Sequence, residues 1–261
     1  MHSIRLAGTF LRIAITNELQ YRVNFFIQIL QSLISLAIGL IGLALVFDYT
    51  SDLNGWSANE LLMVMGIYLL MGGVIRAAIQ PNMNRLMQEI REGMLDYALT
   101  KPADSQVLVS VREFRFWQLA DVAVGAVVLG VAFSRSGQTL SVVQALAFIA
   151  VLLMGALMIY SFWLMITSSA FWIIRVDEIV NLFEGIYAAG RWPVGIYPNW
   201  LRLSLTFLVP VAFAVTVPAE ALTGRLTLPT LLGAFALTAF LLALSRWVWK
   251  KGVRNYSGAS A

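Results

Sequence analysis

Long apolar stretches separated by short polar connections dominate the chain. A helix that crosses a bilayer needs about 20 mostly apolar residues, because each residue adds only about 1.5 Å. Six windows meet or approach this length: residues 23–47, 60–80, 116–133, 142–174, 179–197 and 228–249. The pattern predicts an all-α integral membrane protein with six transmembrane helices.

The fifth window is the weakest, and the segment after it does not look like a straight span. Residues 179–197 carry Glu184 and Arg191. Residues 200–224 are apolar but contain Pro210 and Pro218, and proline removes a backbone donor and clashes with the preceding helical turn. We therefore expect a re-entrant hairpin over residues 200–224, which keeps the number of spans even.

The first 22 residues have a different pattern. Their apolar positions recur at helical spacing, with Arg5 and Arg12 offset from them: Ile4, Ala7, Leu11, Ala14 and Ile15. This is typical of an amphipathic helix on a membrane surface, so we expect an interfacial helix over residues 1–22. No small-residue cleavage signature follows it, and we expect no cleaved signal peptide.

Composition supports a membrane protein. Hydrophobic residues make up 59% of the 261 residues and charged residues 12%, too few to cover the surface of a soluble domain. The chain has no Cys and a single His, His2, so a multi-histidine or cysteine metal site is excluded. There is no internal repeat of the kind found in many secondary transporters, and one membrane domain over residues 1–261 is expected.

Basic residues lie mainly on one side of the predicted topology. If both termini are cytoplasmic, that side holds Arg5, Arg12, Arg22, Arg85, Arg91, Lys101, Arg112, Arg115, Arg175, Arg246, Lys250, Lys251 and Arg254. The opposite side holds only Arg135, Arg191, Arg202 and Arg225. The positive-inside rule therefore predicts a multi-pass protein of the inner (cytoplasmic) membrane, with the N-terminus and the C-terminus in the cytoplasm.

The longest cytoplasmic connection, residues 81–115, contains the sequence REGMLDYALTKP. One side of a helix here is apolar, and the other is charged: Leu86, Ile90, Met94, Leu95 and Leu99 against Arg85, Glu89, Glu92 and Asp96. Pro102 stops the helix, and Gly93 within it costs about 1 kcal/mol relative to Ala. We expect a short amphipathic helix that either rests on lipid headgroups or docks on a cytoplasmic partner.

Two stretches resemble the type 2 ATP-binding cassette (ABC) exporter permeases. The arrangement REG-x-LD-x-x-L-x-KP resembles their cytoplasmic signature, and its residues are Arg91, Glu92, Gly93, Leu95, Asp96, Leu99, Lys101 and Pro102. Residues 196–224, IYPNWLRLSLTFLVPVAFAVTVPAEALTG, are similar to the stretch before the last span in a subfamily of these permeases. The six-span layout agrees with both.

This resemblance implies a half-transporter. Two permeases, identical or related, would sit on two ATPase subunits, with the helix after the second span as the coupling helix. The residues that would contact the ATPase are Glu92, Gly93, Leu95, Asp96, Leu99 and Pro102. The interfacial helix would also meet the ATPase, and the hairpin would close the outer end of the path.

The sequence itself lacks the motif of an ATP-hydrolysing site. It contains no G-x-x-x-x-G-K-[ST] phosphate-binding loop, so this chain does not hydrolyse ATP by that route. We expect a transport subunit rather than an enzyme, with no cofactor of its own, while ATP and Mg²⁺ would bind to the partner ATPase. The other expected partners are a second permease and the lipid bilayer, with no nucleic acid.

Polar residues inside the predicted spans are candidates for a translocation path, because they are costly in lipid. The first span carries one polar face, which either lines a path or packs against a neighbouring helix: Asn24, Gln28, Gln31, Ser32 and Ser35, followed by Gly39 and Gly42. Asp121 and Arg76 suggest an ion pair or snorkelling. Glu184 either contacts substrate or is neutralised by Arg191, seven residues later.

Other functions remain as alternatives. An ion-coupled secondary transporter would use the intramembrane Asp121 and Glu184 as proton carriers. An intramembrane enzyme has little support, since H-E-x-x-H, G-x-S-x-G and any thiol are missing. The substrate stays open, because the resemblance allows hydrophobic drugs, organic cations, lipids and glycans.

Overall fold

A computed structural model describes residues 22–137, 140–173 and 177–256. Nearly all of the interfacial helix expected over residues 1–22 lies outside this range and stays a prediction. The described residues form helices and connecting loops, without a β-strand, and their one isolated bridge joins Leu53 to Trp56.

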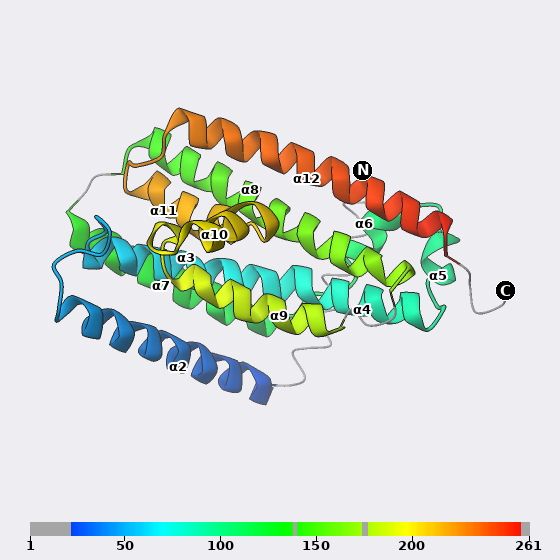
Figure 1. The fold of residues 1–261 in the computed structure, drawn as a ribbon. Helices are drawn as coiled ribbons and strands as arrows, with labels where there is room; N and C mark the ends of the chain where they lie inside the picture. The colour runs from blue at the N-terminus through cyan, green and yellow to red at the C-terminus, as the bar shows by residue number, and fades with distance from the viewer. Residues whose placement is uncertain (1–21, 138–139, 174–176, 257–261) are drawn as a thin grey trace.

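The long helices run side by side in Figure 1. They are α2 (Arg22–Phe47), α3 (Ala58–Val74), α7 (Leu119–Ser136), α8 (Val142–Ser168) and α12 (Leu228–Arg254). A π-helical turn (Ile75–Ile79) joins α3 to α4 (Gln80–Arg91), so the second helix is continuous over Ala58–Arg91. Each of the five is long and apolar enough to cross a membrane, which confirms five of the six predicted windows.

Local sequence signals set where the long helices begin. Ser57 and Glu60 form a capping box at the start of α3, and Ser141 and Gln144 form another at the start of α8. The Thr227 hydroxyl accepts from the Thr230 backbone N–H at the start of α12. These caps fix the three helix starts that follow the connections at one end of the bundle.

The α3 helix lies at the centre of the bundle. It packs most extensively against α7, and glycines on both helices bring the two backbones close together. A Cβ atom placed on Gly125 would lie 2.5 Å from the Leu70 backbone nitrogen, and one on Gly66 would lie 2.8 Å from the Leu129 side chain. Any side chain at Gly125 would therefore push α3 and α7 apart.

The fifth predicted window is not one straight span. It contains α9 (Asp177–Ala188), a helix of 12 residues, followed by two 3₁₀ turns (Ala189–Arg191 and Val194–Ile196). Between these turns Trp192 is extended, as expected for a residue that precedes proline. The structure thus corrects this part of the prediction: the apolar segment is broken at Trp192 and Pro193.

The next segment bends sharply at Pro210, as predicted, but it is not broken at Pro218, which lies inside the helical stretch Ala212–Leu222. The helical stretches Asn199–Leu208 and Ala212–Leu222 meet at an angle of 78°, and they include α10 (Asn199–Leu203) and α11 (Val217–Leu222). Val209, immediately before Pro210, is extended at the bend. The bent pair is compatible with either one broken span or a re-entrant loop, so the hairpin over residues 200–224 remains a prediction.

The helix of the REGMLDYALTKP stretch differs from the prediction. Helix α4 ends at Arg91, and Gly93 has a φ of +69°, in the left-handed region that favours glycine. The Met94 N–H donates to the Glu89 carbonyl at 2.9 Å and the Gly93 N–H to the Ile90 carbonyl at 3.4 Å, which is a Schellman motif. The expected continuous helix with Gly93 inside it is therefore wrong: Gly93 ends one helix, and the short helix α5 (Asp96–Leu99) begins after it.

Candidate functional site

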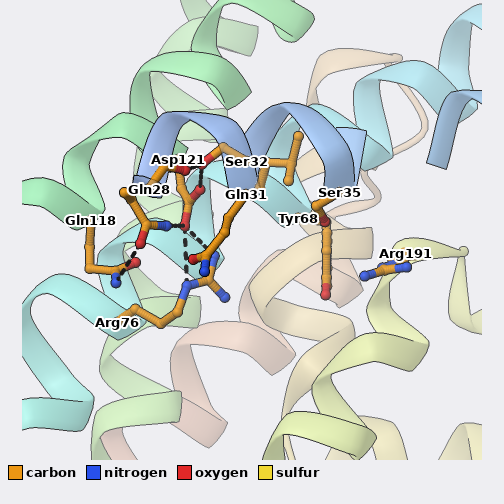
Figure 2. Close-up of a pocket in the computed structure, with 10 residues that line it drawn as sticks. Gln28, Gln31, Ser32, Ser35, Tyr68, Arg76, Gln118, Asp121 and Arg191 are labelled. Carbon is orange, nitrogen blue, oxygen red and sulfur yellow. Dashed lines mark hydrogen bonds and ion pairs between the residues drawn. The ribbon is translucent and has the colours of Figure 1, made fainter. Parts of the chain in front are cut away.

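The polar face of α2 meets a buried carboxylate on α7. Asp121 is 3% exposed, and Arg76 from the π-helical turn after α3 forms an ion pair with it at 2.6 Å. Gln28 donates to the same carboxylate at 3.3 Å, and the Ser32 hydroxyl donates to its other oxygen (Figure 2). The ion pair predicted for Arg76 and Asp121 is confirmed, and three donors satisfy a charge that would otherwise be costly to bury.

A cavity of about 230 Å³ opens beside this cluster, between α2, α3 and α7. Its walls are Gln28, Gln31, Ser32, Ser35, Tyr68, Leu69, Arg76, Gln118, Asp121 and Arg191 (Figure 2). The α2 side chains predicted as path-lining at Gln28, Gln31 and Ser35 therefore border a polar cavity. The backbone of Asn24 lies in α2, but its side chain is outside the described part of the structure.

Glu184 on α9 borders a second cavity, of about 260 Å³. Its carboxylate accepts from Gln80 Nε2 at 3.1 Å. Arg191 does not form the expected ion pair with Glu184, since the helix between them ends at Ala188. Its guanidinium lies instead over the Tyr68 ring, 5.4 Å from the centroid.

A third cavity, of about 210 Å³, is mostly apolar. It lies between α2, the first turns of α3 and the extended residue Trp192, and its other walls include Ile38, Gly42, Leu43 and Met65. Arg191 borders all three cavities. Arg191 is therefore a wall residue common to the three cavities, between α2 on one side and α3 with α9 on the other.

Sequence reasoning missed Tyr68 and Gln118. Tyr68, Gly72 and Arg76 are four residues apart and border one cavity from a single face of α3, so helical periodicity could have identified Tyr68 from Arg76. Gln118 donates to the side-chain carbonyl of Gln28 at 3.1 Å. It precedes α7, and no sequence signal connects it with a residue 90 positions earlier.

The stretch after α4 has an exposed face and a buried face. Leu95 is fully buried in the core of this chain, and its backbone N–H donates to the Tyr256 hydroxyl at 3.1 Å. Leu95 thus cannot be a surface contact, because it packs inward after the break at Gly93. Tyr97 and Met94 are 77% and 45% exposed. The other predicted ATPase contacts remain at or near the surface: Glu92, Asp96 and Pro102 are exposed, and Gly93 and Leu99 are half-buried.

A polar network joins α4 to residues 112–113, which precede α7. The Asn82 side-chain carbonyl accepts from the backbone N–H groups of Arg112 and Glu113, both at 2.8 Å. Glu89 binds Arg112 at 2.9 Å. These contacts join α4 to the chain that leads into α7.

A second link joins the stretch to α12. Asp104, the N-cap of α6 (Ser105–Ser110), forms an ion pair with Arg246, and Arg246 also donates to Gln106 at 2.7 Å. The hydrogen bond from Arg246 lowers the pKa of Asp104 below its ordinary value. In Figure 1, α5 and α6 lie at the same end of the bundle as the C-terminal end of α12.

With this geometry in place, comparison with known proteins decides the family. A family model described as "ABC-2 family transporter protein" matches residues 33–260. The chain belongs to the ABC-2 transporter family. Comparisons with curated proteins and with solved structures gave no match. The expected resemblance to ABC permeases is confirmed, and the apolar helices together with the family make this ABC-2 protein a multi-pass membrane transport subunit rather than an enzyme.

Proposed function

We propose that this ABC-2 protein is half of the translocation path of an ATP-driven exporter and is driven by a separate ATPase subunit. The observation that carries the proposal is the polar cavity system between α2, α3 and α9 in a chain of this family. A peripheral helix with a polar inner face is suited to line a path that opens and closes. ATP and Mg²⁺ would act on the partner chain.

The second part of the proposal is a permease dimer. Helix α2 exposes large apolar side chains away from the cavities, including Phe26 at 69%, Leu30 at 59% and Ile41 at 60%. Lipid or a second permease, identical or related, would cover this surface. Two copies would together enclose the path, and each would contribute its own polar cavity beside α2.

The ATPase would dock at the end that carries α5 and α6, which we assign to the cytoplasm. Tyr97 and Met94 would enter the ATPase surface, surrounded by Glu92, Asp96 and Pro102. The fixed contacts of α4 with residues 112–113 would pass ATPase closure to α3 as a rigid movement. In the proposed exporter, this movement would open the path outward.

The ion-coupled alternative gains no support from the site. Arg76, Gln28 and Ser32 occupy the Asp121 carboxylate, and Gln80 donates to Glu184. No observation favours these two carboxylates as free proton carriers over their role in these contacts.

The experiment that tests the proposal replaces Tyr97. Leu95, the predicted apolar contact, is unsuitable because it is buried and its substitution would disturb folding. Tyr97→Asp should insert and accumulate normally, since the side chain is 77% exposed, but co-purification of the candidate ATPase should fall roughly tenfold as a charge enters the desolvated contact. Tyr49→Asp is the matched control, at a tyrosine that is 91% exposed at the opposite end of the bundle. Intact ATPase binding by Tyr97→Asp would refute docking at α5, and a transport-competent chain that binds no ATPase would refute the whole proposal.

A further inference from the structure

Arg191 is a cation without an ion pair in the described part of the chain. Arg76 pairs with Asp121, whereas no carboxylate of the described residues lies within ion-pair distance of Arg191. Its neighbour is the face of the Tyr68 ring, and Figure 2 shows the guanidinium directed toward that ring. A cation–π contact compensates for less of the lost hydration than a paired carboxylate does.

The position of Tyr68 places this charge deep in the membrane. Tyr68 lies ten residues after the start of α3 at Ala58, which corresponds to about 15 Å along the helix. The hydrocarbon core of a bilayer is about 30 Å thick, so with Ala58 at its outer boundary the Tyr68 ring, and Arg191 over it, would lie about halfway across. Charged side chains at this depth are costly and mark ligand pathways, which calls for an anion that visits the site.

An apolar chamber adjoins Arg191. Among the residues that border the third cavity, Arg191 is the single charged one, and the rest of its wall is aliphatic, glycine and Trp192. A Cβ atom on Gly42 would meet nothing within 4 Å, so the chamber is open at that position. A ligand at Arg191 would thus reach amide and hydroxyl groups on one side and an apolar space on the other.

The charges around the three cavities favour an anion at this point. Two arginines and two carboxylates border them: Arg76, Arg191, Asp121 and Glu184. Arg76 and Asp121 neutralise each other, and Glu184 is exposed and bonded to Gln80, at the α4 end of α3. The apolar chamber holds Arg191 alone, and there an anionic headgroup would find its counter-ion.

We propose that the substrate of this permease is an amphiphile with an anionic headgroup, a carboxylate or a phosphate, that binds Arg191 and places its chain in the apolar chamber. Gln31 and Ser35 border the polar cavity on the same side and supply further hydrogen bonds. The proposal rests on the proposed function, since it names the substrate of the path described there.

The probe pair is 9,10-dibromostearate and its methyl ester, added to the full-length permease in a neutral maltoside detergent at alkaline pH. The two probes share a brominated chain that quenches tryptophan on contact, and they differ in the headgroup charge. Trp192 borders the chamber, so its fluorescence reports occupancy. Half-maximal quenching should need roughly tenfold less stearate than ester, because hydrogen bonds to a charged group are the stronger ones.

Four variants assign the signal to the site. Arg191→Gln should remove the preference for stearate, whereas Arg202→Gln, an exposed arginine that borders none of the three cavities, should keep it. Gly42→Leu should weaken both probes, because Gly42 borders the chamber and its added Cβ meets no atom within 4 Å, so the larger side chain can occupy chamber space. Trp192→Phe should remove the headgroup-selective part of the quenching.

Equal quenching by stearate and ester, or an unchanged preference in Arg191→Gln, would overturn the inference and leave the proposed function intact, because binding needs no ATPase. Displacement by free acetate at the same concentration as stearate would also overturn it, since the site would then hold a simple anion. With the ATPase bound, stearate should stimulate ATP hydrolysis more than the ester does. Selective binding without stimulation would indicate a resident lipid and would reject the substrate assignment.

Discussion

Helices α2 and α3 are similarly apolar, but they have opposite environments. In the apolar window of α3 and its continuation (Ala58–Arg91), 78% of the residues are buried inside the protein, against 6% in the window of Phe26–Phe47 in α2. Helix α3 contacts protein on nearly all sides, whereas α2 contacts the bundle along one stripe, mainly through α7 and α3. Apolarity alone does not separate the two cases, because lipid tails are as apolar as leucine side chains.

The positions of the polar residues and glycines distinguish the environments of α2 and α3. Those of α2 lie on its one inner face, at Gln28, Gln31, Ser32 and Ser35, and they border the cavity with Arg76 and Asp121. Helix α3 uses glycines instead, and they allow close contact between backbones. We therefore expect substitutions in α3 and its contacts to change stability, and substitutions on the inner face of α2 to change transport.

The largest effect is expected where α7 touches α3. Gly125→Leu should lower the free energy of unfolding by at least about 3 kcal/mol, because even a Cβ atom would lie 2.5 Å from the Leu70 nitrogen. Gly130→Leu on the same helix is the control, since a Cβ there meets nothing within 4 Å. Thermal unfolding in detergent measures the stability of both variants. Equal stability would contradict the conclusion that the Gly125 face of α7 is closely packed and the Gly130 face is open.

The next effect tests whether the buried core continues past α4. Leu95→Ala should cost about 2 kcal/mol or more, because the side chain is fully buried. Met94→Ala, at the neighbouring residue that is 45% exposed, should change stability by less than about 1 kcal/mol. If both variants were as stable as the wild type, Leu95 would not be part of the buried core and would belong to the docking surface.

On α2 the expectation reverses. Gln31→Leu should leave stability within about 0.5 kcal/mol of the wild type but change substrate-stimulated ATP hydrolysis in the assembled complex, because Gln31 borders the polar cavity. Gln28→Leu should alter hydrolysis as well and cost about 1 kcal/mol more, because it removes a donor to Asp121. Normal hydrolysis in both variants would place the path elsewhere.

The smallest effect concerns the link between α6 and the peripheral helix α12. Asp104→Asn keeps the helix cap but loses the ion pair with Arg246, and the cost at neutral pH should be below about 1 kcal/mol, since both side chains are more than one third exposed. The folded-state pKa of Asp104 is lowered, so its contribution is present above the ordinary value of 3.8 and is lost as the pH falls through the folded-state pKa. Unfolding curves of wild type and variant should converge in acid, and a gap that persists there would show that the charge is not the cause.

The long helices and several of their boundaries follow from local features of the sequence. Apolar length predicted α2, α3, α7, α8 and α12, and the residues around Ser57 and Ser141 specify two capping boxes. Pro210 predicted the bend after residue 209. The motif around residues 91–102 indicated the family that the match over residues 33–260 shows. These features depend on helix length, capping and proline geometry, which are local properties of the chain.

The tertiary structure decided which residues meet and which faces are covered. The α2 polar face was predicted, but its partners Asp121 and Gln118 come from positions about 90 residues later. Leu95 and Met94 are both apolar, and the reversal at Gly93 buries one and exposes the other. Pairing of Arg191 with Glu184 on a continuous helix was one of the two alternatives for Glu184, and the break after α9 directs Arg191 over Tyr68 instead. Hydrophobic patterns record that a position avoids water, but lipid, a neighbouring helix and a second chain all satisfy that requirement, so three-dimensional packing alone distinguishes them.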